Sequence, residues 1–177
     1  GNTFYDVKRK EFYSYKNSET VQDGSWYGAE PIWVTAQKNS LKTATYFWIG
    51  SEAEINGYRP NIYKNFIPLV NPYEKVDEAM DWLNLPKLER PDLVLLYFDE
   101  PDHSAHTYGS TAKETMKQVK KSDEVLGYLL NSLNDVDKDF NLIIVSDHGM
   151  TDVHEDKIIN INMHINTDEI NIFGKGP

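Results

Sequence analysis

Two short clusters of acidic and histidine side chains are the part of this sequence best suited to chemistry. Asp102 and His106 form the first cluster, and Asp147 and His148 form the second. Oxygen and nitrogen ligands in this mixture, without sulfur, suit zinc best, with manganese or iron as alternatives. Two such cations roughly 4 Å apart can activate an attacking oxygen and stabilise a leaving oxygen in a displacement at phosphorus. The residue types therefore predict a two-metal site, in which each metal needs further ligands beyond these four residues.

Apolar runs that precede both clusters indicate how the chain positions them. Residues 93–98 and 141–146 are each about five apolar residues long, too short for a helix and rich in β-formers. Residues 110–134 carry apolar side chains three and four positions apart, which predicts a long helix capped by Ser110. Strand, helix and strand in this order form a right-handed crossover between parallel strands. Since parallel strands carry their following loops to one edge of a sheet, we expect the two clusters to share one site.

Weaker patterns predict the remaining elements of an α/β fold. Residues 1–30 are polar and aromatic without a clean period, which indicates a loop region with at most one short strand. We further expect a helix at 31–38, a strand at 44–48, a long loop at 52–72, a helix at 73–83 and a strand at 157–162.

Composition excludes several classes of function. The formal net charge of −10 and the pI of about 4.9 argue against a nucleic-acid groove or an anionic membrane surface as the main target. The absence of cysteine excludes disulfides, thiolate metal sites and a cysteine nucleophile. No run approaches the roughly 20 apolar residues that span a bilayer. Because the sequence starts at Gly1 without methionine, we expect an internal piece of a longer protein.

A simpler interpretation of each cluster is a helix cap, a turn or a solvated loop. An acid and a histidine just beyond a strand are commonly no more than that. Their repetition at two neighbouring strand ends favours the metal site over this alternative.

Longer stretches around both clusters resemble a known family. Residues 99–109, Asp-Glu-Pro-Asp-His-Ser-Ala-His-Thr-Tyr-Gly, resemble the Glu-Glu-Pro-Asp-x-x-Gly-His-x-Tyr-Gly motif of the ectonucleotide pyrophosphatase/phosphodiesterase family, in the alkaline phosphatase superfamily. Residues 146–151 resemble its Ser-Asp-His-Gly-Met block. Shorter matches occur, in the family's order, at residues 2–6, 30–35, 47–48 and 54–57.

The resemblance implies an alkaline-phosphatase-like fold, with a mostly parallel central sheet flanked by helices. Residues 1–177 would be part of one catalytic domain with no internal boundary. Asp102 and His106 would hold one Zn²⁺, and Asp147 and His148 the other. The family cleaves nucleotide pyrophosphate or phosphodiester bonds through a phosphoryl-threonine intermediate. Its threonine and remaining metal ligands would lie outside this sequence, so these residues by themselves are expected to be inactive.

The resemblance also implies substrate-binding roles for three residues. Asn2 matches an asparagine that donates to a phosphate oxygen, although a turn asparagine is the simpler interpretation. Trp48 matches a pocket tryptophan, and Phe66 falls where relatives place a tyrosine that stacks on a base. Packing in the core is the alternative for both rings.

Three departures from the family leave the substrate open. Ala105 replaces a glycine, Ile49 replaces a proline, and no clear lysine stands at the nucleotide-pocket position near Val21. A choline-phosphodiester or lysophospholipid phosphodiesterase is therefore an alternative, as is a non-catalytic interaction protein that retains the fold. We expect a small-molecule partner and, from relatives, an extracellular or membrane-anchored protein whose membrane contact lies in segments outside this sequence. No Asn-x-Ser/Thr glycosylation site is present.

Overall fold

A three-stranded parallel sheet forms the centre of the computed structural model, which describes residues 2–136, 139–166, 168 and 170. The strands lie in the order β4 (Ile62–Lys64), β3 (Thr43–Tyr46) and β5 (Leu93–Leu96). The central strand β3 pairs with both neighbours, and Thr43, Ala44 and Thr45 are fully buried in it. All three strands therefore end at the same edge of the sheet.

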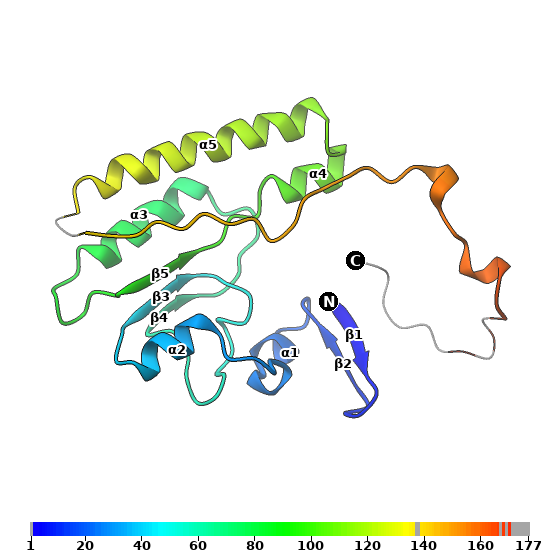
Figure 1. The fold of residues 1–177 in the computed structure, drawn as a ribbon, viewed down its shortest axis with the longest axis horizontal. Helices are drawn as coiled ribbons and strands as arrows, with labels where there is room; N and C mark the ends of the chain where they lie inside the picture. Colours follow the sequence, from blue (N-terminus) through cyan, green and yellow to red (C-terminus); the bar gives the residue numbers. More distant parts are fainter. Residues whose placement is uncertain (1, 137–138, 167, 169, 171–177) are drawn as a thin grey trace.

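Helices cover the sheet from both sides, and on one side a further helix packs on the outer face of the covering helix (Figure 1). Helix α2 (Ile32–Lys38) and helix α3 (Pro72–Leu83) both contact β3. Helix α3 begins at a proline behind the Asn71 cap, and its buried side chains recur with helical spacing. Helix α5 (Lys113–Leu133) lies on α3, where the Tyr128 hydroxyl donates to Asp77 at 2.6 Å.

The principal hydrophobic cluster lies between α2 and the loop that follows β3. Its buried members are Trp33, Val34, Ala53 and Ile55, and the last of these is 1% exposed. Leu95 of β5 packs against the cluster, so the cluster ties the loops on one side of the sheet to the strand that leads to the acidic and histidine residues.

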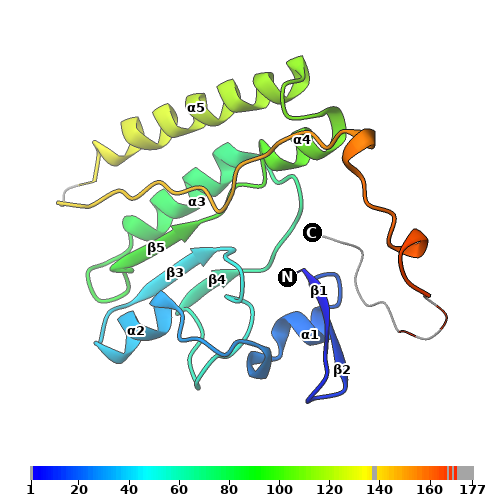
Figure 2. The same ribbon diagram turned by 45° about the vertical axis from the view of Figure 1, so that its right-hand side comes forward.

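An antiparallel hairpin precedes the sheet and lies beside it in both views (Figures 1 and 2). Strands β1 (Thr3–Asp6) and β2 (Glu11–Ser14) form the hairpin, followed by helix α1 (Ser18–Gln22) and the 3-10 turn η1 (Gly24–Trp26). Aromatic rings hold this unit together: Phe4 stacks on Tyr13 at 5.2 Å, and Arg9 lies 3.8 Å over the Trp26 ring.

Most of the predicted helices and strands are confirmed, with small changes of boundary. The helices predicted at 31–38, 73–83 and 110–134 are α2, α3 and α5, and the strands predicted at 44–48 and 93–98 are β3 and β5. The predicted Ser110 cap is wrong, because α5 begins after Ala112, and among the described residues no side chain caps it. The prediction for residues 1–30 missed the second strand of the hairpin, and the prediction of a loop at 52–72 missed β4.

The prediction of a second parallel strand at residues 141–146 is wrong. The segment is irregular, and Ile143 and Val145 are 81% and 67% exposed. A strand requires a neighbour that satisfies its N–H and C=O groups, and β-forming residues do not by themselves provide one. The predicted crossover from β5 through α5 therefore has no second strand in the described part of the chain. The strand predicted at 157–162 is also wrong: the turns η2 (Glu155–Lys157) and η3 (Ile161–Met163) occupy that region.

The segment that links β5 to α5 contains a short helix that the sequence patterns did not predict. Helix α4 (Asp102–Tyr108) follows β5 after a few residues. The Glu100 carboxylate stabilises its first turn by accepting hydrogen bonds from the Ser104 N–H at 3.0 Å and the Ser104 hydroxyl at 2.9 Å. Gly109, with a φ of 98°, ends the helix in a conformation that favours glycine. None of the described helices is long and apolar enough to span a bilayer.

Candidate active site

Helix α4 places the first pair of candidate ligands on one face. Asp102 and His106 are four positions apart, so their side chains lie one above the other. His106 Nε2 is 3.5 Å from Asp102 Oδ1. Ala105, which stands where the family has glycine, is helical and 6% exposed. Because a helix accepts alanine readily, this departure from the family motif does not disturb the pair.

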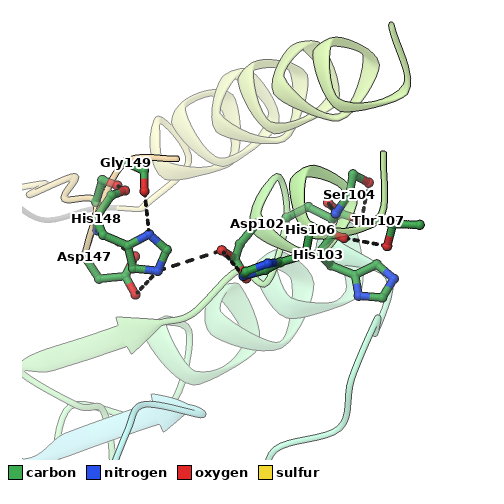
Figure 3. A network of polar contacts seen from close by, with 10 residues as sticks. Asp102, His103, Ser104, His106, Thr107, Asp147, His148 and Gly149 are labelled. Atoms are coloured by element: carbon green, nitrogen blue, oxygen red, sulfur yellow. Dashed lines mark hydrogen bonds and ion pairs between the residues drawn. The ribbon is translucent and has the colours of Figure 1, made fainter. Parts of the chain in front are cut away.

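The second pair reaches the first although no strand carries it there. Residues 139–150 pass along α3 and β5 toward α4 in both views (Figures 1 and 2). His148 Nε2 then lies 3.8 Å from Asp102 Oδ1 and 3.6 Å from Asp147 Oδ2. Figure 3 shows the His148 ring pointing at the Asp102 carboxylate from the side opposite His106. Asp102 is therefore the residue at which the two pairs meet.

A hydrogen bond near the second pair attaches this irregular segment to the helices. The Ser110 N–H, just beyond α4, donates to Asp152 Oδ1 at 2.8 Å. The bond joins residues that are far apart in the sequence, and its acceptor Asp152 follows His148 by only a few positions. It therefore helps to keep the second pair next to α4.

The spacing within each pair fits a shared zinc ion. Zinc–ligand bonds of about 2.0–2.2 Å at tetrahedral angles place two ligand atoms about 3.3–3.6 Å apart. The observed separations are 3.5 Å for Asp102 and His106 and 3.6 Å for Asp147 and His148. Asp102 Oδ1 is buried and has no hydrogen-bond partner among the described residues, as expected of an oxygen that a cation would satisfy.

Each pair nevertheless supplies only two ligands. Among the described residues, no group of three or more histidines and carboxylates is arranged to hold one metal ion. The four residues therefore fit two neighbouring, incomplete sites of two ligands each, which meet where His148 faces Asp102. A closed cage is not formed.

The surroundings of His148 determine which ring nitrogen carries the proton and the direction in which its pKa shifts. Its Nδ1 lies 2.9 Å from the Gly149 carbonyl oxygen, which can only accept, so the ring donates from Nδ1. In the neutral ring this leaves Nε2, the atom facing Asp102, with its lone pair free for a metal. The hydrogen bond to Gly149 raises the pKa of His148, and the Asp147 carboxylate raises it further.

Three aromatic rings border the same edge of the sheet, one beyond each parallel strand. Phe47 follows β3, Phe66 follows β4 and Tyr97 follows β5. The Phe47 ring centroid is 4.8 Å from that of Phe66 and 5.4 Å from that of Tyr97, and the Phe66 and Tyr97 centroids are 6.3 Å apart. Burial raises the pKa of the Tyr97 hydroxyl, and the nearby carboxylates of Asp147 and Asp102 raise it further. The aromatic cluster, meaning these three rings, therefore lies at the edge of the sheet where β5 leads into the helix of Asp102 and His106.

The other predicted site residues lie in different surroundings. Phe66 is 39% exposed within the aromatic cluster. Trp48 is half-buried and packs against the hydrophobic cluster of Trp33, and its backbone N–H donates to the Ser51 hydroxyl oxygen at 3.0 Å. Asn2 is exposed, and its carbonyl accepts from the Tyr15 N–H of the hairpin. Among the described hydrogen bonds, none joins Asn2 to the candidate metal ligands.

Sequence reasoning missed Phe47 and Tyr97 as neighbours of Phe66. The available signal was positional, because each ring stands within two residues of the end of a parallel strand. Parallel strands bring such positions together at one edge.

Comparison with known proteins agrees with this arrangement. The family model for type I phosphodiesterase / nucleotide pyrophosphatase matches residues 1–177. The chain belongs to this family. Human ectonucleotide pyrophosphatase/phosphodiesterase family member 1 is 40% identical over 166 residues, which are 93% of this chain and 18% of that protein. Venom phosphodiesterase 2 of Crotalus adamanteus is 41% identical over 160 residues, 89% of this chain and 20% of that protein. The chain thus spans about a fifth of these phosphodiesterases.

Solved structures of the family confirm the fold class. Human ectonucleotide pyrophosphatase / phosphodiesterase 5 superposes with a TM-score of 0.85 at 28% identity, covering 95% of this chain and 45% of that one. The murine protein superposes with the same TM-score at 24% identity. This member of the family therefore has a partial alkaline-phosphatase-like fold, with a parallel sheet flanked by helices. Its zinc ligands, its substrate residues and its extent as part of one domain remain predictions.

Proposed function

We propose that this chain is part of a two-zinc hydrolase that cleaves nucleotide pyrophosphate or phosphodiester bonds. The observation that carries the proposal is the meeting of the two acid and histidine pairs at Asp102, where Oδ1 lies 3.5 Å from His106 and 3.8 Å from His148. The family match over residues 1–177 gives this geometry its chemical context.

In this proposal Asp102 and His106 hold one Zn²⁺, and Asp147 and His148 hold the other. Bound zinc would polarise a phosphoryl oxygen and stabilise the charge that develops there. The chain's own residues orient the site: the Gly149 carbonyl fixes the His148 ring, and α4 fixes Asp102 relative to His106. Asn2 would donate its side-chain amide to a phosphate oxygen.

The attacking threonine and the remaining ligands lie outside these residues in the proposal. The reaction of the longer protein would pass through a phosphoryl-threonine intermediate. The 177 residues alone would bind metal and substrate without turnover.

The aromatic cluster favours a substrate that carries a base. Phe66 is accessible enough to stack on a ring, and Phe47 and Tyr97 both pack against it. Trp48, which follows Phe47 in the chain, would also line the substrate pocket. A murine ectonucleotide pyrophosphatase / phosphodiesterase 5 variant described as inactive has been solved in complex with AMP, which makes AMP a suitable probe for this chain. Because relatives are named as ectonucleotide and venom enzymes, we also propose an extracellular location for this protein.

Calorimetry on the purified chain tests the proposal. Zn²⁺ should bind in the micromolar range or tighter, and Mg²⁺, which prefers octahedral oxygen ligands, should bind much more weakly. In the presence of Zn²⁺, AMP should bind more tightly than glycerophosphocholine. Tighter binding of glycerophosphocholine would favour the choline-phosphodiester alternative, and an absence of Zn²⁺ binding would leave the interaction-protein alternative.

A further inference from the structure

Lys75 is a buried cation close to the aromatic cluster. It lies in the first half of α3, and its side chain is 3% exposed. Its Nζ donates to the Tyr97 carbonyl oxygen at 3.1 Å and to Asp99 Oδ1 at 3.3 Å. Lysine is almost never fully buried without such partners. These two hydrogen bonds therefore fix the Lys75 side chain and the residues just beyond β5 relative to each other.

Asp99 extends this connection to a third segment. Its second carboxylate oxygen accepts from the Leu69 N–H at 2.7 Å. Leu69 has a φ of 56°, a conformation that L-residues rarely adopt, and it follows Phe66 by three positions. The Lys75 ammonium thus joins α3, the end of β5 and the loop that carries Phe66.

Apolar walls strengthen these contacts. The Tyr46 and Phe98 ring centroids lie 6.0 Å and 5.8 Å from Nζ of Lys75. Charges and hydrogen bonds interact more strongly where rings displace water. Removal of the Lys75 ammonium should therefore disturb its partners more than loss of the exposed pair between Lys64 and Glu78, whose side chains are 44% and 34% exposed.

We propose that Lys75 is a positioning residue for the base of the substrate. This inference rests on the function proposed above. Lys75 holds Tyr97 through its carbonyl and holds the Phe66 loop through Asp99 and Leu69, so it sets the spacing of the two rings, now 6.3 Å between centroids. Its described hydrogen bonds reach Tyr97 and Asp99 and none of the four candidate metal ligands, so we expect it to act on the base-binding rings.

Calorimetry with the variant Lys75→Met tests the role, using Zn²⁺, AMP and ribose 5-phosphate as probes. AMP should bind about fivefold more weakly or worse, the lower end of what one aromatic stack on a base contributes. Binding of Zn²⁺ and of ribose 5-phosphate, which has no base, should stay within about twofold. Lys64→Met is the matched control, because Lys64 forms an exposed ion pair with another side chain of the same helix, and it should leave all three affinities unchanged. Equal losses for AMP and ribose 5-phosphate would overturn the proposal.

A structural measurement decides the role of Lys75 independently of substrate. The nuclear Overhauser effect between the Phe66 and Tyr97 rings should be present in the unsubstituted chain and in Lys64→Met, and should weaken in Lys75→Met. If Lys75→Met does not fold, Lys75→Met/Asp99→Asn removes both charges and keeps an oxygen for the Leu69 N–H. An unchanged ring–ring signal in the folded variant would refute the proposal. If the unsubstituted chain fails to bind AMP, the proposed function is wrong, and the ring–ring signal still decides the role of Lys75.

Discussion

Replacing the shared carboxylate is the most direct perturbation of the candidate metal site. The variant Asp102→Asn keeps the size of the side chain and one oxygen but removes its charge. Asp102 Oδ1 lies 3.5 Å from His106 Nε2 and 3.8 Å from His148 Nε2, so the substitution affects both pairs. The substitution also replaces one carboxylate oxygen by an NH₂ group. This group is a hydrogen-bond donor, and it repels a cation.

The size of the effect follows from the charge that is removed. Two unit charges at about 4 Å interact with about 1 kcal/mol in water and about 4 kcal/mol at the effective dielectric constant of a protein surface. The Asp102 side chain is 44% exposed, so we take the lower end of this range. A divalent cation doubles it to about 2 kcal/mol, which corresponds to a loss of at least about 30-fold in Zn²⁺ affinity.

Isothermal titration calorimetry with Zn²⁺ measures this loss. The control is Asp123→Asn, an exposed residue of α5 that changes the net charge by the same amount. Because the chain carries a formal net charge of −10, this control separates site binding from general attraction of cations. If Asp102→Asn binds Zn²⁺ as tightly as Asp123→Asn, the assignment of Asp102 as a zinc ligand is refuted.

Other regions of the molecule give predictions of different kinds. A methyl group added by Gly24→Ala would lie 1.8 Å from a backbone carbonyl oxygen, so we expect a loss of about 2–3 kcal/mol and a thermal midpoint lower by roughly 5–10 °C in circular dichroism. Gly28→Ala, with no atom within 4 Å of the added carbon, should leave the midpoint unchanged, and equal midpoints for the two variants would contradict the packing at Gly24. In the metal-free protein, nuclear magnetic resonance titration of His148 should give a pKa above its ordinary value of about 6.5, and Asp147→Asn should remove only part of the increase, because the larger cause is the hydrogen bond to the next carbonyl. A raised pKa in the folded state means that this stabilisation is present at pH values below the pKa of the unfolded chain and is lost as the pH rises through the folded value; a titration at the ordinary value would show that the ring is free. Amide hydrogens of residues 141–146 should exchange close to the rate of an unfolded chain, whereas those of β3 should be protected, and protection of 141–146 would mean that the segment pairs with a strand after all.

Local patterns were sufficient for the helices. The spacing of apolar side chains located α2, α3 and α5, because this spacing directly reports which face of a helix is buried. Helix α4 escaped prediction because it has seven mostly polar residues and no apolar period. Its formation depends on contacts with residues on either side, namely the Glu100 carboxylate and the turn at Gly109.

Strand prediction failed where pairing decides the outcome. Residues 93–96 and 141–146 have the same β-forming character, yet only the first group lies next to β3 and forms a ladder. Side-chain preference describes how well a residue suits a sheet, whereas the hydrogen bonds must come from another segment. The sequence pattern contains no information about whether that partner is present.

The residue types capable of chemistry and the family were readable from the sequence alone, because the motifs around Asp102 and His148 are contiguous in the chain. Only the tertiary structure showed that Asp102 faces both histidines, that the aromatic cluster joins the ends of three strands, and that Lys75 bonds the Tyr97 carbonyl and Asp99. These relationships link side chains that are far apart in the sequence. Their distances depend on how helices and strands pack, and no local pattern of residues specifies that packing.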